Sequence, residues 1–198
     1  MQELKGLKYL ASGKRSVAFL ASLGRKKVVL KVEKPGIAAK HPLKKEARIL
    51  KIVNKYKIGP KLIKEGGNFV IVEYVKGIPI LEFFKKSKKK KILEIIKDIL
   101  EQCRILDKLK LNKLEMHRPI RHIIINKKAT MIDFERTYKT KKPKNVTQFC
   151  QFLMQHKRLL KEKGISIEKQ KLISLLRKYK EKQTDANFKM IVSLFLTS

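Results

Sequence analysis

Within the first 75 residues, short apolar runs typical of strands give way to apolar residues at helical spacing and then return. This order of strands, helix and strands limits which folds the chain can adopt. Three apolar runs broken by glycine turns come first and predict antiparallel strands over residues 7–10, 17–20 and 28–30. Between residues 41 and 56 apolar positions recur every three or four residues, which predicts a helix that Gly59-Pro60 ends. Two more strands are expected at 61–64 and 69–75. Residues 1–76 are therefore expected to form a small β-rich lobe with one helix.

The chain is expected to leave this lobe through Gly77-Ile78-Pro79 and to form a second, mostly helical lobe over residues 77–198. Apolar residues at helical spacing predict helices near 80–86, 91–110, 145–163, 167–182 and 185–196. A hairpin is expected between the second and third helices, with strands at 122–125 and 130–133. The basic run 88–91 falls between two helices, as a solvated linker or as part of a binding surface. The two lobes together predict an α+β chain.

The charge of the chain is strongly positive. It has 198 residues, with 50 Lys and Arg against 17 Asp and Glu, and a formal net charge of +33. Because 43% of the residues are hydrophobic, a wholly disordered basic chain is excluded. A Lys-rich genome or a hot habitat would raise Glu together with Lys, which this composition does not show. The charge therefore predicts a polyanionic partner, and nucleic acid is the commonest one.

The apolar segments are too short for a membrane protein. No run approaches the ~18 apolar residues of a membrane span, and the first residues lack the apolar block of a signal peptide. We therefore expect no membrane partner and a cytoplasmic location. Cys103 and Cys150 stand alone in helical stretches and are expected to be buried thiols rather than metal ligands or a disulfide.

The order of the elements resembles that of the protein-kinase-like fold. Val28-Val29-Leu30-Lys31 places a lysine on the third strand, and Glu46 follows on the next helix, 15 positions later. The helical period puts Glu46 one turn from Leu43 and Leu50, on the side that faces the sheet. The resemblance implies that Lys31 holds the α- and β-phosphates of ATP and that Glu46 orients Lys31.

Two further segments fall where this fold contacts a nucleotide. Residues 11–17 take the place of the glycine-rich phosphate loop, although only Gly13 of three expected glycines is present, and an ordinary hairpin turn is the alternative. The backbone from Glu73 to Val75 falls where adenine would bind. The resemblance thus implies ATP contacts from Gly13, Glu73 and Val75 besides Lys31 and Glu46.

Met131-Ile132-Asp133-Phe134-Glu135 resembles the Asp-Phe-Gly metal motif of kinases, with Glu in the place of Gly. A carboxylate that leaves a strand into a loop suits Mg²⁺, which prefers oxygen ligands. The resemblance implies that Asp133 binds a magnesium ion that bridges the phosphates. An aspartate that caps a turn is the alternative.

The catalytic loop departs from the kinase pattern. Aligned on the strand at 123–125, His122 takes the usual Asn position, His117 the catalytic Asp position and Glu115 the first His position. Either the catalytic base is lost, as in a pseudokinase, or His117 or Glu115 assists the attacking hydroxyl; each histidine could also be purely structural. Three arginines near the loop are expected to bind phosphates, namely Arg118, Arg121 and Arg136.

The segment that follows is short and basic. Protein kinases carry a long activation segment here, which binds peptides, and no such segment lies between Glu135 and Asn145. Residues 136–144 suit phosphates better than a peptide. The residues expected to bind RNA are therefore Lys88, Lys89, Lys90, Arg136, Lys139, Lys141, Lys142 and Lys144.

Three pieces of the sequence together resemble an archaeal RNA kinase family once regarded as predicted serine/threonine kinases. They are Glu115 with Arg118-Pro119-Ile120-Arg121-His122-Ile123, then residues 132–136, then residues 144–149. The likeness covers essentially the full length. It implies a transferase that uses ATP and Mg²⁺ to phosphorylate the 2′-hydroxyl of a uridine in the variable-loop region of tRNA. The sequence does not define the oligomeric state, and a monomer is the working expectation. The alternatives are an atypical serine/threonine protein kinase and a non-catalytic RNA-binding pseudokinase.

Overall fold

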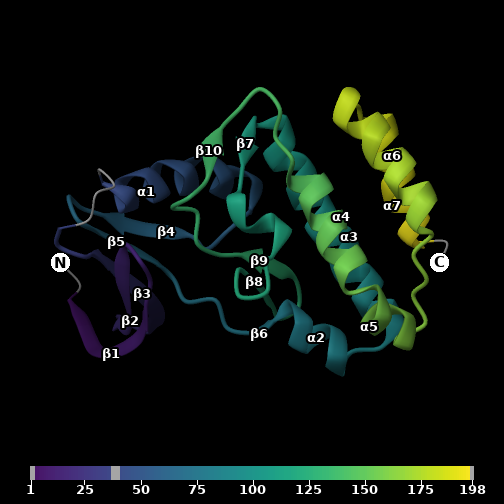
Figure 1. The fold of residues 1–198 in the computed structure, drawn as a ribbon. Coiled ribbons are helices and arrows are strands. Elements are labelled where there is room, and N and C mark those ends of the chain that lie inside the picture. Colours follow the sequence, from purple (N-terminus) through teal and green to yellow (C-terminus); the bar gives the residue numbers. More distant parts are fainter. Residues whose placement is uncertain (1–2, 37–40, 197–198) are drawn as a thin grey trace. The chain divides into compact units, whose positions relative to one another are not determined.

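A computed structural model describes residues 3–36 and 41–196. The chain is α+β and divides into two compact units (Figure 1). The first unit comprises Met1–Lys76 with Thr130–Thr137, and the second comprises Gly77–Ala129 with Tyr138–Ser198. Residues 130–137, which the sequence assigns to the second lobe, group with the first unit because Phe134 packs beside Gly59 and its amide bonds to Glu46.

The first unit is a five-stranded antiparallel sheet with one α-helix. Its strands are β1 (Leu4–Ser12), β2 (Ser16–Leu23), β3 (Lys26–Glu33), β4 (Leu62–Glu65) and β5 (Phe69–Glu73), in the order β1-β2-β3-β5-β4. Lys31 of β3 lies opposite Ala18 of β2 on one side and Val70 of β5 on the other. The sheet register therefore places Lys31 on the central strand.

Helix α1 (Pro42–Val53) packs on strands β3, β4 and β5. Proline is tolerated in the first turn because amides there have no intrahelical partner, and the Glu33 carboxylate accepts a hydrogen bond from the Leu43 amide at 2.9 Å. One face of the helix is buried, with Leu43, Glu46, Ala47, Leu50 and Val53. A 3₁₀ turn, η1 (Asn54–Tyr56), follows it. The helical period predicted for this segment is thus confirmed, with a tighter last turn.

The second unit is mostly helical. Its helices are α2 (Ile80–Lys86), α3 (Lys89–Lys108), α4 (Asn145–Gln155), α5 (Lys157–Glu162), α6 (Lys169–Glu181) and α7 (Asp185–Leu196). Helix α3 runs beside α4 and also contacts α7 (Figure 1). The apolar face of α3 is at most 5% exposed at Ile92, Ile95, Ile96, Ile99, Leu100, Cys103 and Leu106. Burial of such a face supplies most of the stability of a helix in a protein.

Short strands connect these helices. β8 (Ile123–Ile125) and β9 (Ala129–Met131) form the predicted hairpin, and β6 (Ile78–Pro79) pairs with β8. β7 (Leu111–Asn112) pairs with β10 (Tyr138–Lys139), and the 3₁₀ turn η2 (Leu114–His117) follows β7. The sequence does not predict β6, β7 or β10, because two-residue strands carry no period that could be recognised.

Two expectations about helix ends are wrong. Lys89 and Lys90, expected between helices, form the first turn of α3 together with Lys91, since lysine is a good helix former and the buried face begins directly after them. The single helix expected over 145–163 is interrupted at His156, where φ is −102° and ψ is 20°. Neither glycine nor proline marks this break, and apolar residues at helical spacing occur on both sides of it. The sequence therefore predicts one continuous helix.

Both cysteines are buried, unpaired thiols, as the sequence predicts. Burial raises the pKa of each thiol, which keeps both protonated and unreactive. Within residues 3–36 and 41–196, no helix combines the length and the apolar character that a membrane span needs.

Candidate functional site

The candidate site of the first unit is centred on Lys31 of β3 and Glu46 of α1. The Lys31 Nζ donates to both carboxylate oxygens of Glu46 at 2.8 Å. Glu46 is 1% exposed and the Lys31 side chain 15% exposed. A charge is expensive to bury unless it is paired and hydrogen-bonded, so each side chain makes the burial of the other tolerable. The two residues that the sequence pairs thus form a largely buried ion pair.

Glu46 also anchors the segment that follows β9. Its Oε1 accepts a hydrogen bond from the Phe134 amide at 3.0 Å, and the Lys31 Nζ lies 3.6 Å from Asp133 Oδ1. Asp133 has a φ of 63°, a left-handed conformation that a residue other than glycine keeps only where its surroundings hold it. Lys31 therefore lies between the carboxylates of Glu46 and Asp133. The backbone amide that directly follows Asp133 is hydrogen-bonded to Glu46.

The charges in this cluster shift one another's pKa values. Burial alone would lower the pKa of Lys31, but Glu46 and then Asp133 raise it above its ordinary 10.5, so the ammonium group stays charged. Burial and the nearby Asp133 raise the pKa of Glu135 above 4.5, and Lys31 and Arg15 oppose this only in part. Carboxylates held close together in this way are typical of sites that bind a cation or do proton chemistry.

Gly59 belongs to the same cluster through Phe134. Gly59 has a φ of +78°, and a Cβ there would lie 2.8 Å from Cε2 of Phe134 and 3.2 Å from Cδ2 of Leu50. Phe134 is fully buried, so the absence of a side chain at Gly59 allows the ring to lie against the backbone. The sequence suggests for Gly59 only a helix stop, because Gly-Pro after a helix has the same pattern in either role.

The two segments expected to contact a nucleotide, the β1–β2 turn and the backbone from Glu73 to Val75, show fewer specific features than the Lys31–Glu46 cluster. Gly13 lies in the β1–β2 turn, where its amide donates to Ser16 O at 2.9 Å and a Cβ would come no closer than 3.6 Å to that oxygen. This turn does not require glycine. The amides of Glu73 and Tyr74 donate to Lys61 O and Lys27 O, so both are already engaged within the protein.

The donor set of the first unit fits a magnesium ion that arrives with phosphates. In the part of the chain that the structure describes, no group of three or more His, Cys, Asp or Glu side chains could hold a metal by itself. Asp133 and Glu135 provide two carboxylates that disfavour each other's charge. Mg²⁺ is usually held by one or two carboxylates together with phosphate oxygens and water. The residues therefore suit Mg²⁺ bound with a nucleotide better than a permanent metal site.

The loop expected to act on the acceptor belongs to the second unit. Glu115 is 7% exposed and accepts a hydrogen bond at 3.1 Å from the Nζ of Lys113, which is itself fully buried. His117 is exposed, and its Nδ1 lies 2.8 Å from Leu114 O. Because a carbonyl can only accept, Nδ1 carries the hydrogen, and Nε2 is then the acceptor of the neutral ring. Glu115 is thus held in a buried ion pair, whereas His117 faces solvent.

The end of this loop carries the remaining predicted residues. His122 is half-buried, and its amide donates to Pro119 O at 2.9 Å, which closes a turn. Arg118 and Arg121 are exposed. Arg136 is also exposed and belongs to the first unit, with Asp133 and Glu135.

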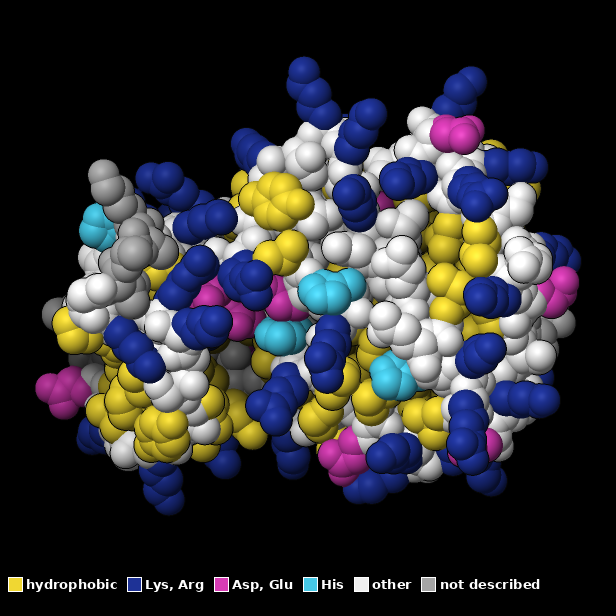
Figure 2. Space-filling view, in the orientation of Figure 1, with side chains coloured by type: hydrophobic (Ala, Val, Ile, Leu, Met, Phe, Trp, Pro, Cys, Tyr) yellow, Lys and Arg dark blue, Asp and Glu magenta, His cyan; other side chains and the backbone are white. Residues whose placement is uncertain are grey.

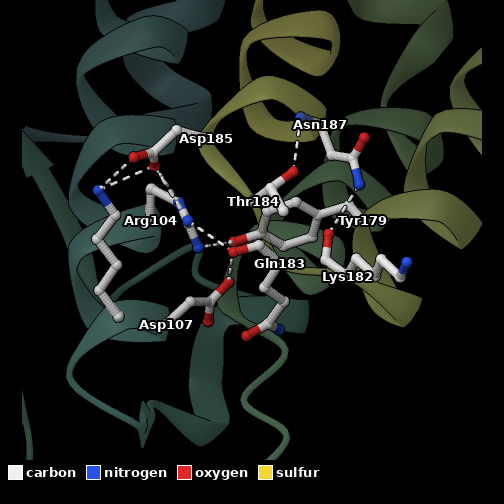
Figure 3. Close-up of polar contacts among 9 residues, drawn as sticks. Arg104, Asp107, Tyr179, Lys182, Gln183, Thr184, Asp185 and Asn187 are labelled. Carbon is white, nitrogen blue, oxygen red and sulfur yellow. Dashed lines mark hydrogen bonds and ion pairs between the residues drawn. The ribbon is translucent and has the colours of Figure 1, made fainter.

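A buried polar network that the sequence did not reveal supports the loop, and Figure 3 shows the part of it that Asp107, Tyr179 and Arg104 form. Asp107 Oδ1 accepts hydrogen bonds from the backbone and side-chain nitrogens of Asn145, at 3.0 and 2.7 Å, and Oδ2 accepts one from Tyr179 at 2.9 Å. Asn145 Oδ1 accepts the Lys113 amide at 2.8 Å. Burial raises the pKa of Asp107, while the bonds from Asn145 and Tyr179 oppose the rise. The only sequence signal is an acidic residue next to the apolar face of α3.

The lysines expected to bind RNA are exposed. Lys88, Lys89 and Lys90 lie at the start of α3, and Lys139, Lys141, Lys142 and Lys144 lie on β10 and the segment after it. Figure 2 shows Lys and Arg side chains scattered across the visible face among hydrophobic and other side chains, with far fewer Asp and Glu. The sequence matches no protein-family model, and no curated protein is significantly similar to it.

Proposed function

We propose that the chain is an ATP-dependent RNA kinase with a protein-kinase-like fold, which phosphorylates the 2′-hydroxyl of a uridine in the variable-loop region of tRNA. The observation that carries the proposal is the position of Lys31 between Glu46 and Asp133, with the Phe134 amide bonded to Glu46. Kinases use the same set: a strand lysine, a helix glutamate and an aspartate that binds metal.

Each member of the cluster has a separate task in this proposal. Lys31 binds α- and β-phosphate oxygens, and Glu46 keeps the ammonium group in place. Asp133 and Glu135 would hold Mg²⁺, which neutralises phosphate charge when bound. Val75 would contact adenine through its backbone, and the turn that contains Gly13 would lie near the phosphates. Because Lys31 and Asp133 are prepositioned, little reorganisation would be needed when the nucleotide binds.

The charge of the chain favours RNA over protein as the acceptor. The net charge is +33, and the segment after Arg136 is short and carries exposed lysines in place of a peptide-binding platform. Lysines that contact phosphates position a nucleic acid without reading its sequence. The choice of tRNA and of a uridine rests on the family resemblance alone.

His117 is the loop residue best suited to assist the hydroxyl. Its Nε2 is the acceptor of the neutral ring and can take the hydroxyl proton as the phosphoryl group is transferred. Glu115 would act by holding Lys113 and the loop, and the guanidinium groups of Arg118, Arg121 and Arg136 would bind phosphate oxygens. Phosphoryl transfer depends chiefly on positioning and charge neutralisation, so a weak base is sufficient.

The test is phosphate transfer from γ-labelled ATP to total tRNA, with generic protein substrates in parallel. We expect labelling at one tRNA position and none of the proteins. Lys31→Ala and Asp133→Ala should each abolish it, because they remove the charge on the phosphates and the metal ligand. Lys27→Ala, an exposed lysine on the same strand, is the matched control and should retain activity. Full activity in either site variant would exclude this role for the cluster.

A non-catalytic RNA-binding protein is the second candidate, because the one carboxylate of the loop, Glu115, is already held in a buried ion pair with Lys113. In that case tRNA would bind but would not be labelled by the wild-type chain. Transfer that falls at least tenfold in His117→Asn would favour the kinase. Labelling of proteins rather than tRNA would favour a protein kinase instead.

A further inference from the structure

Strand β10 and its surroundings form an exposed basic patch with one aromatic side chain, made of Tyr138, Lys139, Lys141, Lys142, Lys144 and Lys110. Tyr138 is 43% exposed, and among the described residues of the second unit it is the one exposed aromatic side chain. Lys139, the next residue in the chain, lines an open hollow of about 380 Å³ together with Lys110, Thr140 and Lys141. We call these residues the β10 patch.

The backbone of the β10 patch is held rigidly by the second unit. Tyr138 and Lys139 pair with Asn112 and Leu111 of β7, both of which are buried. The Thr140 amide donates to Lys110 O at 2.9 Å, and the Lys144 amide donates to Asn112 Oδ1 at 2.7 Å. Because these hydrogen bonds already order the backbone, ligand binding would not carry the free-energy cost of ordering it.

The positive charge of the β10 patch is not neutralised by the protein. None of the salt bridges among the described residues involves its five lysines, although nearby Lys108 pairs with Asp185. Like charges gathered in this way repel one another, and a polyanion relieves the repulsion. The exposed ring of Tyr138 adds an apolar face, which binding of phosphate groups does not require.

We propose that the β10 patch binds an unpaired stretch of RNA, with one base stacked on Tyr138 and the adjoining phosphates held by Lys110, Lys139 and Lys141. This inference rests on the proposed function and specifies the form of RNA that the site takes. A base offers its face to an aromatic ring only when it is unstacked, as in loops and single strands, and paired RNA keeps its bases covered. The β10 patch therefore selects single-stranded regions over helices.

The test is equilibrium binding of the full chain to a labelled short oligouridine and to a duplex of equal length, without ATP. Tyr138→Ala should weaken binding of the single strand by about 5- to 150-fold, the loss seen when a stacking side chain is removed. The same variant should bind the duplex like the wild type, and Tyr138→Phe should retain the affinity for both. Tyr56→Ala, which removes another exposed tyrosine, is the matched control and should change neither affinity.

Direct contact is tested with 5-iodouridine in the single strand, which should crosslink to Tyr138. The inference is overturned if Tyr138→Ala binds the single strand within twofold of Tyr56→Ala, or if both RNAs lose affinity equally. Unchanged melting of the variants shows that the fold is kept. If the wild type labels tRNA but Tyr138→Ala does not change binding, the RNA-binding role of the β10 patch is rejected and the proposed function is not. A wild-type chain that neither binds nor labels RNA would reject the proposed function as well.

Discussion

At the scale of single residues, Gly59 should matter for the reaction although it carries no side chain. A methyl group at this position would lie 2.8 Å from the Phe134 ring, so Gly59→Ala should displace Phe134 and, with it, the adjacent Asp133. Displacing a group by about 1 Å at such a site can cost up to about 100-fold in rate. We expect phosphate transfer to fall at least tenfold, measured as single-turnover rates across ATP concentrations.

Gly6→Ala separates this effect from backbone strain. Gly6 of β1 has a φ of +65°, similar to the +78° of Gly59, but no atom lies within 4 Å of its position for a Cβ. Gly6→Ala should lose about 1 kcal/mol of unfolding free energy, because alanine is forced into the left-handed region, and Gly59→Ala should lose more because its methyl group also clashes with the Phe134 ring. Only Gly59→Ala should lose activity. Equal rates in the two variants would show that the contact with Phe134 is unimportant.

Glu135 should make the stability of the protein depend on pH. Its pKa is raised above 4.5 in the folded chain, by burial and then by Asp133, so the folded state binds this proton more tightly than the unfolded state. Stability from this group is therefore present below pH 4.5 and is lost as the pH rises through the raised value. Glu135→Gln removes the charge and should stabilise the chain at pH 7, by less than about 1 kcal/mol because solvent still reaches the side chain.

Urea unfolding at pH 7 and pH 4 measures this difference. The stabilising effect of Glu135→Gln should shrink toward zero at the lower pH. Glu73→Gln, at the exposed end of β5, makes the same change of net charge and should have no such effect. A variant less stable than the wild type at pH 7 would mean that Glu135 is stabilised as a carboxylate, contrary to the direction of its pKa shift.

At the scale of elements, the contact of α3 with α4 and α6 depends on Asp107. Its two oxygens accept hydrogen bonds from the Asn145 amide, the Asn145 side chain and the Tyr179 hydroxyl. Asp107→Asn replaces one carboxylate oxygen, an acceptor, by an NH₂ group, a donor, which would face the N–H or O–H donors of Asn145 or Tyr179. The buried donors would then lack a partner, which destabilises the fold. We expect a loss of about 3 kcal/mol of unfolding free energy, measured by urea titration.

Asp185→Asn is the control for this prediction. Asp185 contacts Arg104 at the rim of the same network (Figure 3), but the Asp185 side chain is 60% exposed. Asparagine at this position keeps one oxygen that can still accept the hydrogen bonds of the nearly buried Arg104, so we expect a clearly smaller loss than in Asp107→Asn. Similar losses in both variants would show that burial of Asp107 adds nothing to its hydrogen bonds.

At the scale of the whole molecule, the net charge of +33 should dominate RNA affinity. Each phosphate that is neutralised releases counterions, so affinity should fall by ~10³-fold or more between roughly 50 and 200 mM salt if six or more phosphates are contacted. The triple variant of Lys88, Lys89 and Lys90 to alanine should reduce the slope of log affinity against log salt by about 1 for each phosphate contact removed. Binding isotherms over several salt concentrations give the slope.

A triple variant with the same loss of charge provides the comparison. Lys5, Lys26 and Lys27 are exposed lysines of the first unit that are not expected to contact RNA. Their replacement by alanine should leave the slope nearly unchanged. Equal slopes for the two triple variants would indicate that attraction is spread over the whole surface rather than confined to a binding face.

The pairing of Lys31 with Glu46 was expected from the resemblance to kinases. The sequence by itself determined the order of the five strands and the helix of the first unit, the longer helices of the second unit and the burial of the two cysteines. These follow from local patterns, because turns, apolar periods and helical phase each need only a few neighbouring residues. It left the kinase-like fold and the acceptor as expectations, since both rest on resemblance. Tertiary structure alone decided that residues 130–137 belong with the first unit, that Gly59 accommodates Phe134, and that Asp107 bonds Asn145 and Tyr179, which lie 38 and 72 positions away. Contacts across such separations depend on how whole elements pack, and no local pattern of residues records that packing.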